Sequence, residues 1–112
     1  MMFYRLREED GTANAFSAGT LMGSDGTVRV LGVQDVELRA LEHWVSSATG
    51  TVYPVAWSLD VPSVGLNLVI EPLLANQELD LSVRYWEGAV EAEGTWEEAP
   101  IQARGYVELT GY

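Results

Sequence analysis

The sequence contains no cysteine and only one histidine, His43. Without cysteine the chain can form no disulfide framework, no thiolate nucleophile and no cysteine-ligated metal site. A lone histidine, with no second histidine or carboxylate at ligand spacing, is a poor metal ligand, so we predict no metal site. The compartment stays open, because a cysteine-free domain folds equally well in oxidising and reducing surroundings.

Several longer signatures are also missing. No stretch approaches the roughly 20 apolar residues of a transmembrane helix, so we predict no membrane span. Met1–Tyr4 is followed at once by Arg5 and a charged turn, which does not match a signal peptide. No serine lies in a Gly-x-Ser-x-Gly nucleophile elbow, and no glycine-rich phosphate-binding loop is present. We therefore predict no cofactor.

Basic residues are scarce. The chain has 17 acidic residues against 6 basic ones, which gives a formal net charge of −11. There is no lysine, and the basic residues are Arg5, Arg7, Arg29, Arg39, Arg84 and Arg104. Such a surface repels phosphate backbones and anionic lipids, so nucleic acid is excluded as a partner class. The acidic residues are dispersed along the chain, and we interpret them as a contribution to solubility.

The sequence does contain repeated short segments of alternating apolar and polar residues. Apolar residues make up 47% of its 112 residues, enough for the core of one globular domain over 1–112. Turn residues such as Asp25-Gly26 separate the segments, a pattern typical of antiparallel strands. The predicted strands are Met2–Arg7, Phe16–Met22, Val28–Leu31, Gln34–Trp44, Val52–Val61, Gly65–Glu71, Ser82–Gly94 and Ala103–Tyr112. The segment Leu73–Asp80 is predicted to be irregular.

The segment Gln34–Trp44 leaves two alternatives open. Val36, Leu38 and Ala40 alternate with charged or bulky neighbours, and this period of two favours a strand. A helix would instead place five residues on one face: Val33, Val36, Ala40, Leu41 and Trp44.

The strand count and spacing predict the architecture. About eight strands with turns every 8–12 residues or so are typical of a β-sandwich or β-barrel. No helical crossover is present, so the strands must pair antiparallel. The chain opens inside a strand and closes on one, at Tyr112. Either the first and last strands close on each other, or the chain is part of a longer protein, because a barrel otherwise leaves exposed edges.

The last third of the chain carries a specific set of segments. Glu71-Pro72-Leu73-Leu74, Asn76-Gln77-Glu78-Leu79, YWEGAV from Tyr85 and GYVELTGY from Gly105 follow in that order. Together they resemble the C-terminal lipocalin-like domain of the AttH and carotenoid hydratase (hydroxyneurosporene synthase) family. Met2–Arg7 and Gly19-Thr20-Leu21 are similar to the earlier part of that domain, so the resemblance covers nearly the whole chain.

The resemblance implies an antiparallel calycin-type (lipocalin-like) barrel that is incomplete at its N-terminus. Members of the family usually carry two such barrels, so a missing N-terminal barrel domain or a homodimer is the implied protein partner. Members include hydratases of isoprenoid double bonds, which makes a hydro-lyase activity one implied function. Many bacterial members are exported or lipid-anchored, which suggests the cell envelope or secretion as the location.

An apolar small molecule is the implied ligand, because an eight-stranded barrel can enclose a lined cavity. Val55, Trp57, Leu59 and Val61 share one strand face, and Trp86 shares another with small residues. These small residues can form a cavity or can let a neighbouring strand pack over the indole. The candidate ligand-binding residues are Trp57, Trp86, Tyr106, Tyr112 and His43, although a position on the barrel rim is the favoured interpretation of His43.

Hydration of a double bond needs a proton donor, for which a carboxyl group in an apolar pocket is suited. The carboxyl candidates are Glu87, Glu108, Glu71 and Asp60. Glu108 is the predicted catalytic residue because it shares a face with Tyr106, Thr110 and Tyr112. The alternatives are that it points to solvent or that it forms an ion pair with Arg84 or Arg104.

Three functions follow. The first is a lipocalin-like domain that binds an apolar ligand or packs on a partner barrel, with no complete active site of its own. The second is part of a hydratase-like lyase, with the acid supplied partly by a missing domain. The third is a purely structural barrel that stabilises its partner.

Overall fold

The computed structural model describes all residues, 1–112, and contains nine strands and one short 3-10 helix, η1. The elements are β1 (Met2–Tyr4), β2 (Ala18–Met22), β3 (Val28–Gly32), β4 (Glu37–Val45), β5 (Val52–Val61), η1 (Pro62–Val64), β6 (Leu66–Pro72), β7 (Glu78–Asp80), β8 (Arg84–Trp96) and β9 (Ala99–Thr110). No helical segment is long and apolar enough to cross a membrane. The chain divides into two compact units, Met1–Glu37 and Leu38–Tyr112.

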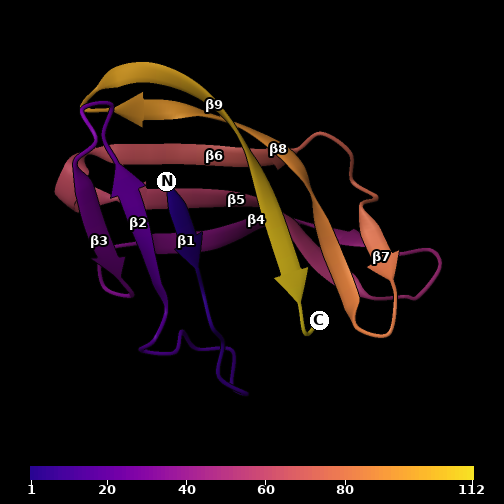
Figure 1. Ribbon diagram of the computed structural model, residues 1–112. Coiled ribbons are helices and arrows are strands. Elements are labelled where there is room, and N and C mark those ends of the chain that lie inside the picture. The colour runs from indigo at the N-terminus through magenta and orange to yellow at the C-terminus, as the bar shows by residue number, and fades with distance from the viewer. The chain divides into compact units, whose positions relative to one another are not determined.

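The strand pairing forms two sheets (Figure 1). One has the order β1-β2-β3, and the other has the order β4-β5-β6-β8-β7, with β9 paired to β8. The predicted antiparallel all-β fold is confirmed, and the helical alternative for Gln34–Trp44 is wrong because β4 occupies that segment. Neither sheet closes on itself, so the pairing leaves open edges.

Tight turns organise the first unit. Asp25 accepts hydrogen bonds from the amide and hydroxyl of Thr27 at 3.0 and 2.7 Å, and Gly26 takes a φ of 84° between them. Asp10 and Thr12 make the same two contacts around Gly11, whose φ is 82°. Glycine adopts this left-handed conformation without steric cost. The Asp-Gly turn predicted between the second and third strands is therefore where the chain reverses.

One face of the three-stranded sheet is buried and the other is exposed. Leu31 is fully buried, and Gly19 lies beneath Phe3, whose Cδ2 atom would be 2.8 Å from a Cβ at position 19. The opposite face exposes apolar side chains of all three strands: Met2, Tyr4, Met22, Val28 and Val30. A strand with one buried face alternates in this way because successive side chains point to opposite sides.

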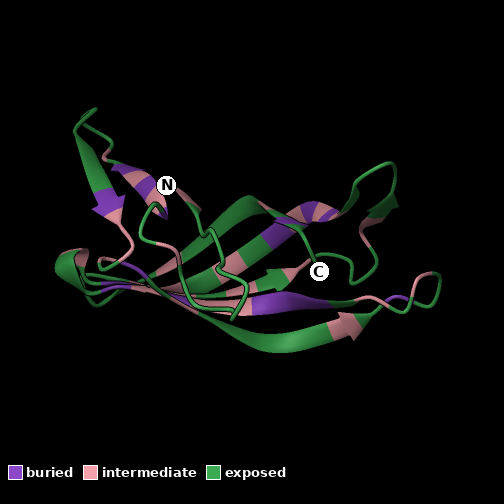
Figure 2. Cartoon of the chain, turned by 90° about the horizontal axis from the view of Figure 1, so that it is seen from below, coloured by how far each residue is buried: buried purple, intermediate pink, exposed green.

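The six-stranded sheet of the second unit follows the same alternation (Figure 2). In β8, Trp86, Gly88 and Val90 are buried, whereas Glu91 and Glu93 are exposed. The register places Trp86 opposite Leu109 on β9, and Trp57 on β5 opposite Ile70 on β6. These residues belong to one continuous apolar face, which we call the aromatic face. The glutamates of β8 and the charged residues of β9 lie on the other side, which we call the polar face.

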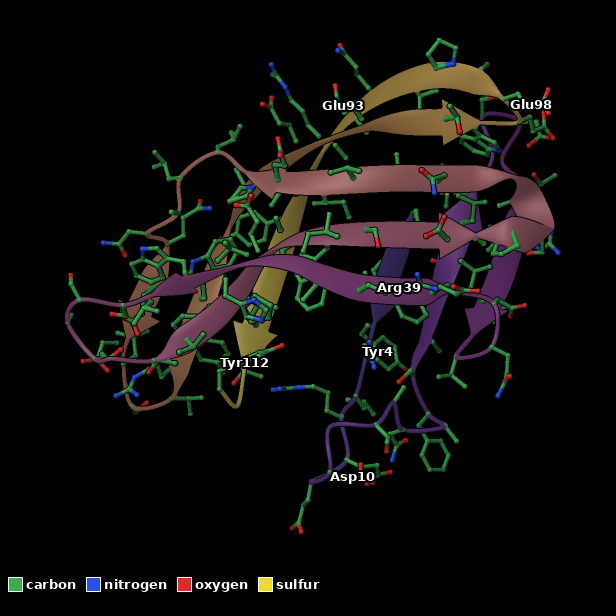
Figure 3. All side chains as sticks on the ribbon, turned by 180° about the vertical axis from the view of Figure 1, so that it is seen from behind. Tyr4, Asp10, Arg39, Glu93, Glu98 and Tyr112 are labelled. Atoms are coloured by element: carbon green, nitrogen blue, oxygen red, sulfur yellow. The ribbon has the colours of Figure 1, made fainter.

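The strand ends differ from the prediction mainly where turn signals are weak. β5 has the predicted bounds, but β8 and β9 meet in a two-residue turn, Glu97-Glu98, with φ values of 49° and 68°. This hairpin conformation usually selects Asn-Gly, so a Glu-Glu pair gives no sequence signal for it. Figure 3 shows Glu98 at the hairpin end. The segment predicted to be irregular contains β7, a strand of only three residues.

Candidate functional site

Trp86 is the centre of the buried cluster in the second unit. It is fully buried and packs with Tyr53, Val55 and Leu109. Its Nε1 atom donates a 2.8 Å hydrogen bond to the carbonyl oxygen of Ala75, so the one polar atom of the indole is satisfied. Strands β5, β8 and β9 each contribute to this cluster, which fixes the position of the aromatic face.

Aromatic rings extend this cluster toward solvent. The rings of Trp44 and Tyr53 stack with centroids 6.2 Å apart and an interplanar angle of 19°. Tyr112 contacts the same Tyr53 ring in a tilted arrangement, at 5.9 Å and 50°. Figure 3 places Tyr112 just beyond the end of β9. The predicted ligand-binding residues Trp86 and Tyr112 thus lie in one neighbourhood, together with Trp44 and Tyr53, which the sequence did not single out.

Glu78 is the buried carboxylate of this neighbourhood. Its side chain is only 5% exposed. It accepts hydrogen bonds from the hydroxyls of Ser46 at 2.5 Å, Thr49 at 2.6 Å and Tyr53 at 3.0 Å. The Arg84 guanidinium lies 4.0 Å away. These hydroxyl donors, led by Ser46 and Thr49, hold the pKa of Glu78 below its ordinary value, so the group is ionised at neutral pH.

The pKa of Tyr53 shifts in the opposite direction to that of Glu78. Burial, together with the neighbouring Glu78 carboxylate, raises the pKa of the Tyr53 phenol. The cluster therefore pairs a neutral phenol donor with a carboxylate that accepts. Glu78 can orient a hydroxyl group or a water molecule, but it carries no proton to give at neutral pH.

Trp57 lies on the aromatic face and packs against the same cluster. Its Nε1 atom is buried and donates no hydrogen bond to any protein atom. A buried N–H without an acceptor costs about 1–3 kcal/mol, and native structures contain few of them. Among the predicted ligand-binding residues, Trp57 is therefore the one with unused hydrogen-bonding capacity.

The small residues beside Trp86 do not leave a cavity at Gly88. The carboxamide of Gln77 occupies this space, and a Cβ at position 88 would lie 1.9 Å from it. The carboxamide accepts a hydrogen bond from the amide of Ala89 at 3.0 Å and donates one to the carbonyl of Leu74 at 2.9 Å. Gly88 therefore allows a close approach of the β6–β7 connection, in agreement with the packing alternative.

The remaining predicted residues lie elsewhere. Glu108 is exposed on the polar face of β9, opposite Glu87 on β8, and Tyr106 beside it is 65% exposed. His43 is exposed on β4. The structure thus brings Glu108 and Tyr106 together on one face but does not bring them to the Trp86 cluster.

The ion pair between Glu108 and Arg84, one of the alternatives for Glu108, does not form. Arg84 instead pairs with Asp80, its Nε atom lying 3.4 Å from the carboxylate, and faces Glu78 across the β7–β8 hairpin. Nor does Arg104 pair with Glu108, because the two residues are four positions apart on the same extended strand.

The other carboxyl candidates also lie away from the aromatic face. Asp60 accepts a hydrogen bond from the Asn67 carboxamide on the polar side of β5 and β6. Glu71 lines a shallow groove of about 460 Å³ on the polar face, together with Glu91, Glu93 and Arg104. No group of three or more His, Asp or Glu side chains in the chain is arranged to hold a metal ion.

Comparison with known proteins relates the chain to one family and to two solved structures. A family model described as AttH-like matches residues 1–112. The solved structure of an AttH protein from Nitrosomonas europaea is 33% identical, with a TM-score of 0.81 over 96% of this chain. Kievitone hydratase from Nectria haematococca is 20% identical, with a TM-score of 0.77 over 96% of this chain, a likeness of fold. No curated protein sequence matches the chain. The chain spans 33% of the length of each of the two solved structures.

Proposed function

The chain belongs to the AttH-like family, and we propose that it is a lipocalin-like domain that binds an apolar, lipid or isoprenoid-like small molecule on its aromatic face. The observation that carries the proposal is the buried Trp57 N–H without an acceptor, next to the Trp86 cluster. A ligand oxygen that enters between the side chains covering this atom would satisfy the N–H, while the rings of Trp44 and Tyr112 supply flat apolar surface.

The proposed ligand therefore has two parts. Most of it is hydrocarbon, because the side chains around Trp86 are apolar and the contact area is aromatic. At least one hydrogen-bond acceptor, such as a hydroxyl or carbonyl oxygen, is placed to meet Trp57 Nε1. The net charge of −11 favours a neutral ligand over an anionic one.

Retinol and anhydroretinol test this proposal, because both are isoprenoid polyenes and only retinol carries a hydroxyl group. We expect both to quench the tryptophan fluorescence of the chain, and we expect retinol to bind more tightly. Trp57→Phe should remove the preference for retinol, since it keeps an apolar ring and deletes the N–H. Trp96→Phe, near the β8–β9 turn, is the matched control and should leave the preference intact. The proposal would be overturned if neither compound quenched the tryptophan fluorescence.

A hydratase-like role is the second candidate, and the fold likeness to kievitone hydratase favours it. Adding water to a double bond needs a proton donor and a positioned water molecule. Glu78 is ionised at neutral pH, and the predicted acid Glu108 is exposed on the polar face. We therefore propose that this chain supplies the binding surface and that the complete active site needs further residues, as the greater length of the two solved relatives allows.

Incubation with kievitone separates the two functions. Mass spectrometry of the mixture would detect the gain of one water molecule per substrate molecule. Turnover by the 112-residue chain would contradict the proposal that its site is incomplete. Binding without turnover supports the ligand-binding function. If neither is observed with kievitone or the retinoids, the structural role of the domain is the remaining one.

A further inference from the structure

Strand β9 forms an open edge of the six-stranded sheet (Figure 1). It pairs with β8 along its whole length and with no other strand. Five successive residues, 102–106, are exposed, so neither face of this stretch is covered. A long exposed edge strand presents unpaired N–H and C=O groups that can pair with another chain.

The hydrogen bonds of β8 show which residues of β9 present these groups. In an antiparallel pair, backbone groups alternate between pointing at the partner strand and pointing away from it. The amide of Glu87 donates to the carbonyl of Gln77 at 3.1 Å, and the carbonyl of Ala89 also accepts from that side, so both point away from β9. Their partners on β9, Glu108 and Tyr106, therefore direct their own N–H and C=O groups to the open edge.

Pro100 agrees with this alternation. It has the same parity as Tyr106 and Glu108, so its missing N–H would have pointed to the open edge and not to β8. Even-numbered residues from position 102 to 108 thus form a continuous row of outward backbone groups. Their side chains lie on the polar face, where Arg104 and Tyr106 are exposed.

We propose that this edge is a homodimer interface, in which β9 pairs antiparallel with β9 of a second copy around a two-fold axis at Tyr106. In this register Arg104 of each copy lies opposite Glu108 of the other, and the two Tyr106 side chains are neighbours. All these residues direct their backbone groups outward, so the register forms a regular hydrogen-bonded ladder. A two-fold interface must be self-complementary, and β9 meets this condition because it carries one positive and one negative charge at equal distances from Tyr106.

Charge and size select this register over its neighbours. A two-fold axis at Arg104 would bring two arginines face to face, and an axis at Glu108 would bring two glutamates face to face, which is unfavourable. With the axis at Tyr106, Gly105 lies opposite Val107 on the aromatic side of the strand, so a small residue meets a branched one. Arg104 lies opposite Glu91 on β8 but makes no ion pair within 4.0 Å, so its guanidinium can turn to Glu108 of the second copy.

A charge swap tests the register. At physiological salt, where charges are screened beyond about 8 Å, sedimentation equilibrium should reveal a dimer. Arg104→Glu or Glu108→Arg alone should weaken it about tenfold or more, because each places like charges opposite each other in both copies of the contact. The double variant should restore it. Glu42→Arg on β4 is the matched control for the added positive charge and should have no such effect.

A proline substitution tests the backbone hydrogen bonds of the proposed interface separately from its charges. Tyr106→Pro removes an outward N–H and should abolish the dimer while the circular dichroism spectrum stays that of the folded chain. A chain that is monomeric at every concentration would overturn the proposal. A dimer that persists in the Tyr106→Pro variant and in both single charge reversals would also overturn it. So would assembly into species larger than a dimer. If Tyr106→Pro unfolds the chain, the charge-swap series alone decides.

Discussion

The Tyr53 hydroxyl donates a 3.0 Å hydrogen bond to Glu78 and thereby connects β5 to β7, two strands that do not pair through their backbones. The hydroxyls of Ser46 and Thr49, in the turn between β4 and β5, bind the same carboxylate. One side chain of a three-residue strand thus connects the edge of the sheet to the β4–β5 hairpin.

Removing the Tyr53 hydroxyl tests the strength of this connection. Tyr53 is fully buried, so Tyr53→Phe keeps the ring packing and loses one hydrogen bond to a charged acceptor. We expect a loss of about 1–2 kcal/mol in the free energy of unfolding, measured by urea denaturation. Tyr4→Phe, at an exposed site, should change it by less than about 0.5 kcal/mol. Equal stability of the two variants would contradict this account.

Acid should weaken the second unit through Glu78. The folded-state pKa of Glu78 lies below its ordinary value of 4.5, so its contribution to stability is fully present above that pH. The contribution is lost as the pH falls from 4.5 through the lowered pKa, because the unfolded state then binds a proton first. Glu78→Gln should therefore reduce the pH dependence of the melting temperature below this value.

The same acid series should also show a slope change for Asp25→Asn. The Thr27 hydroxyl and amide lower the pKa of Asp25, so its contribution also disappears as the pH falls below its ordinary value. This variant lies in the other unit and serves as the comparison for Glu78→Gln. An acid profile unchanged by Glu78→Gln would show that the three hydroxyl contacts do not stabilise the carboxylate in solution.

The β8–β9 turn contains a backbone conformation that its residues disfavour. Glu97 and Glu98 both have positive φ values, and a non-glycine residue in this region costs roughly 1–2 kcal/mol. Replacing the pair by Asn-Gly should stabilise the chain by about 1 kcal/mol, measured by thermal and urea unfolding. Replacement by Ala-Ala removes the same charges without favouring the turn, so a gain there of equal size would assign the effect to charge.

Two glycines on the aromatic side of the β8–β9 hairpin should respond differently to an added methyl group. A Cβ at Gly94 would lie 2.0 Å from the carbonyl oxygen of Asn67, whereas one at Gly105 would meet only Val90, at 3.6 Å. We expect Gly94→Ala to cost about 3 kcal/mol, because backbone must move to accommodate it. Gly105→Ala should stay within about 0.5 kcal/mol of wild type, and similar losses in chemical denaturation would refute the assigned packing.

The sequence predicted those elements whose local signal agrees with the final fold. Val52–Val61 alternates clearly and is β5, and Asp25-Gly26 forms the expected turn. The Glu97-Glu98 turn was missed because β8 and β9 impose a backbone conformation that glutamate does not favour. β7 was missed because three residues are too few to show a period.

The candidate site was predicted only in part, for a physical reason. Trp57, Trp86 and Tyr112 could be predicted because large aromatic residues are common in apolar binding sites. The structure places them near Tyr53. Glu78 could not be found in this way, because its environment is made by hydroxyls from a turn that is distant in sequence. Glu108 looked equivalent in sequence, but strand alternation places it on the polar face.

The short β7 also has a consequence for motion within the native state. Its backbone is held by three residue pairs with β8, whereas β8 and β9 pair along the full hairpin. Protection of amides against hydrogen exchange follows local opening, so the amides of β7 should exchange faster than those at the centre of β8. Protonation of Glu78 weakens its contacts to the β4–β5 hairpin and should accelerate that opening further. Transient access to the Trp86 ring would then be gated by a single carboxyl group.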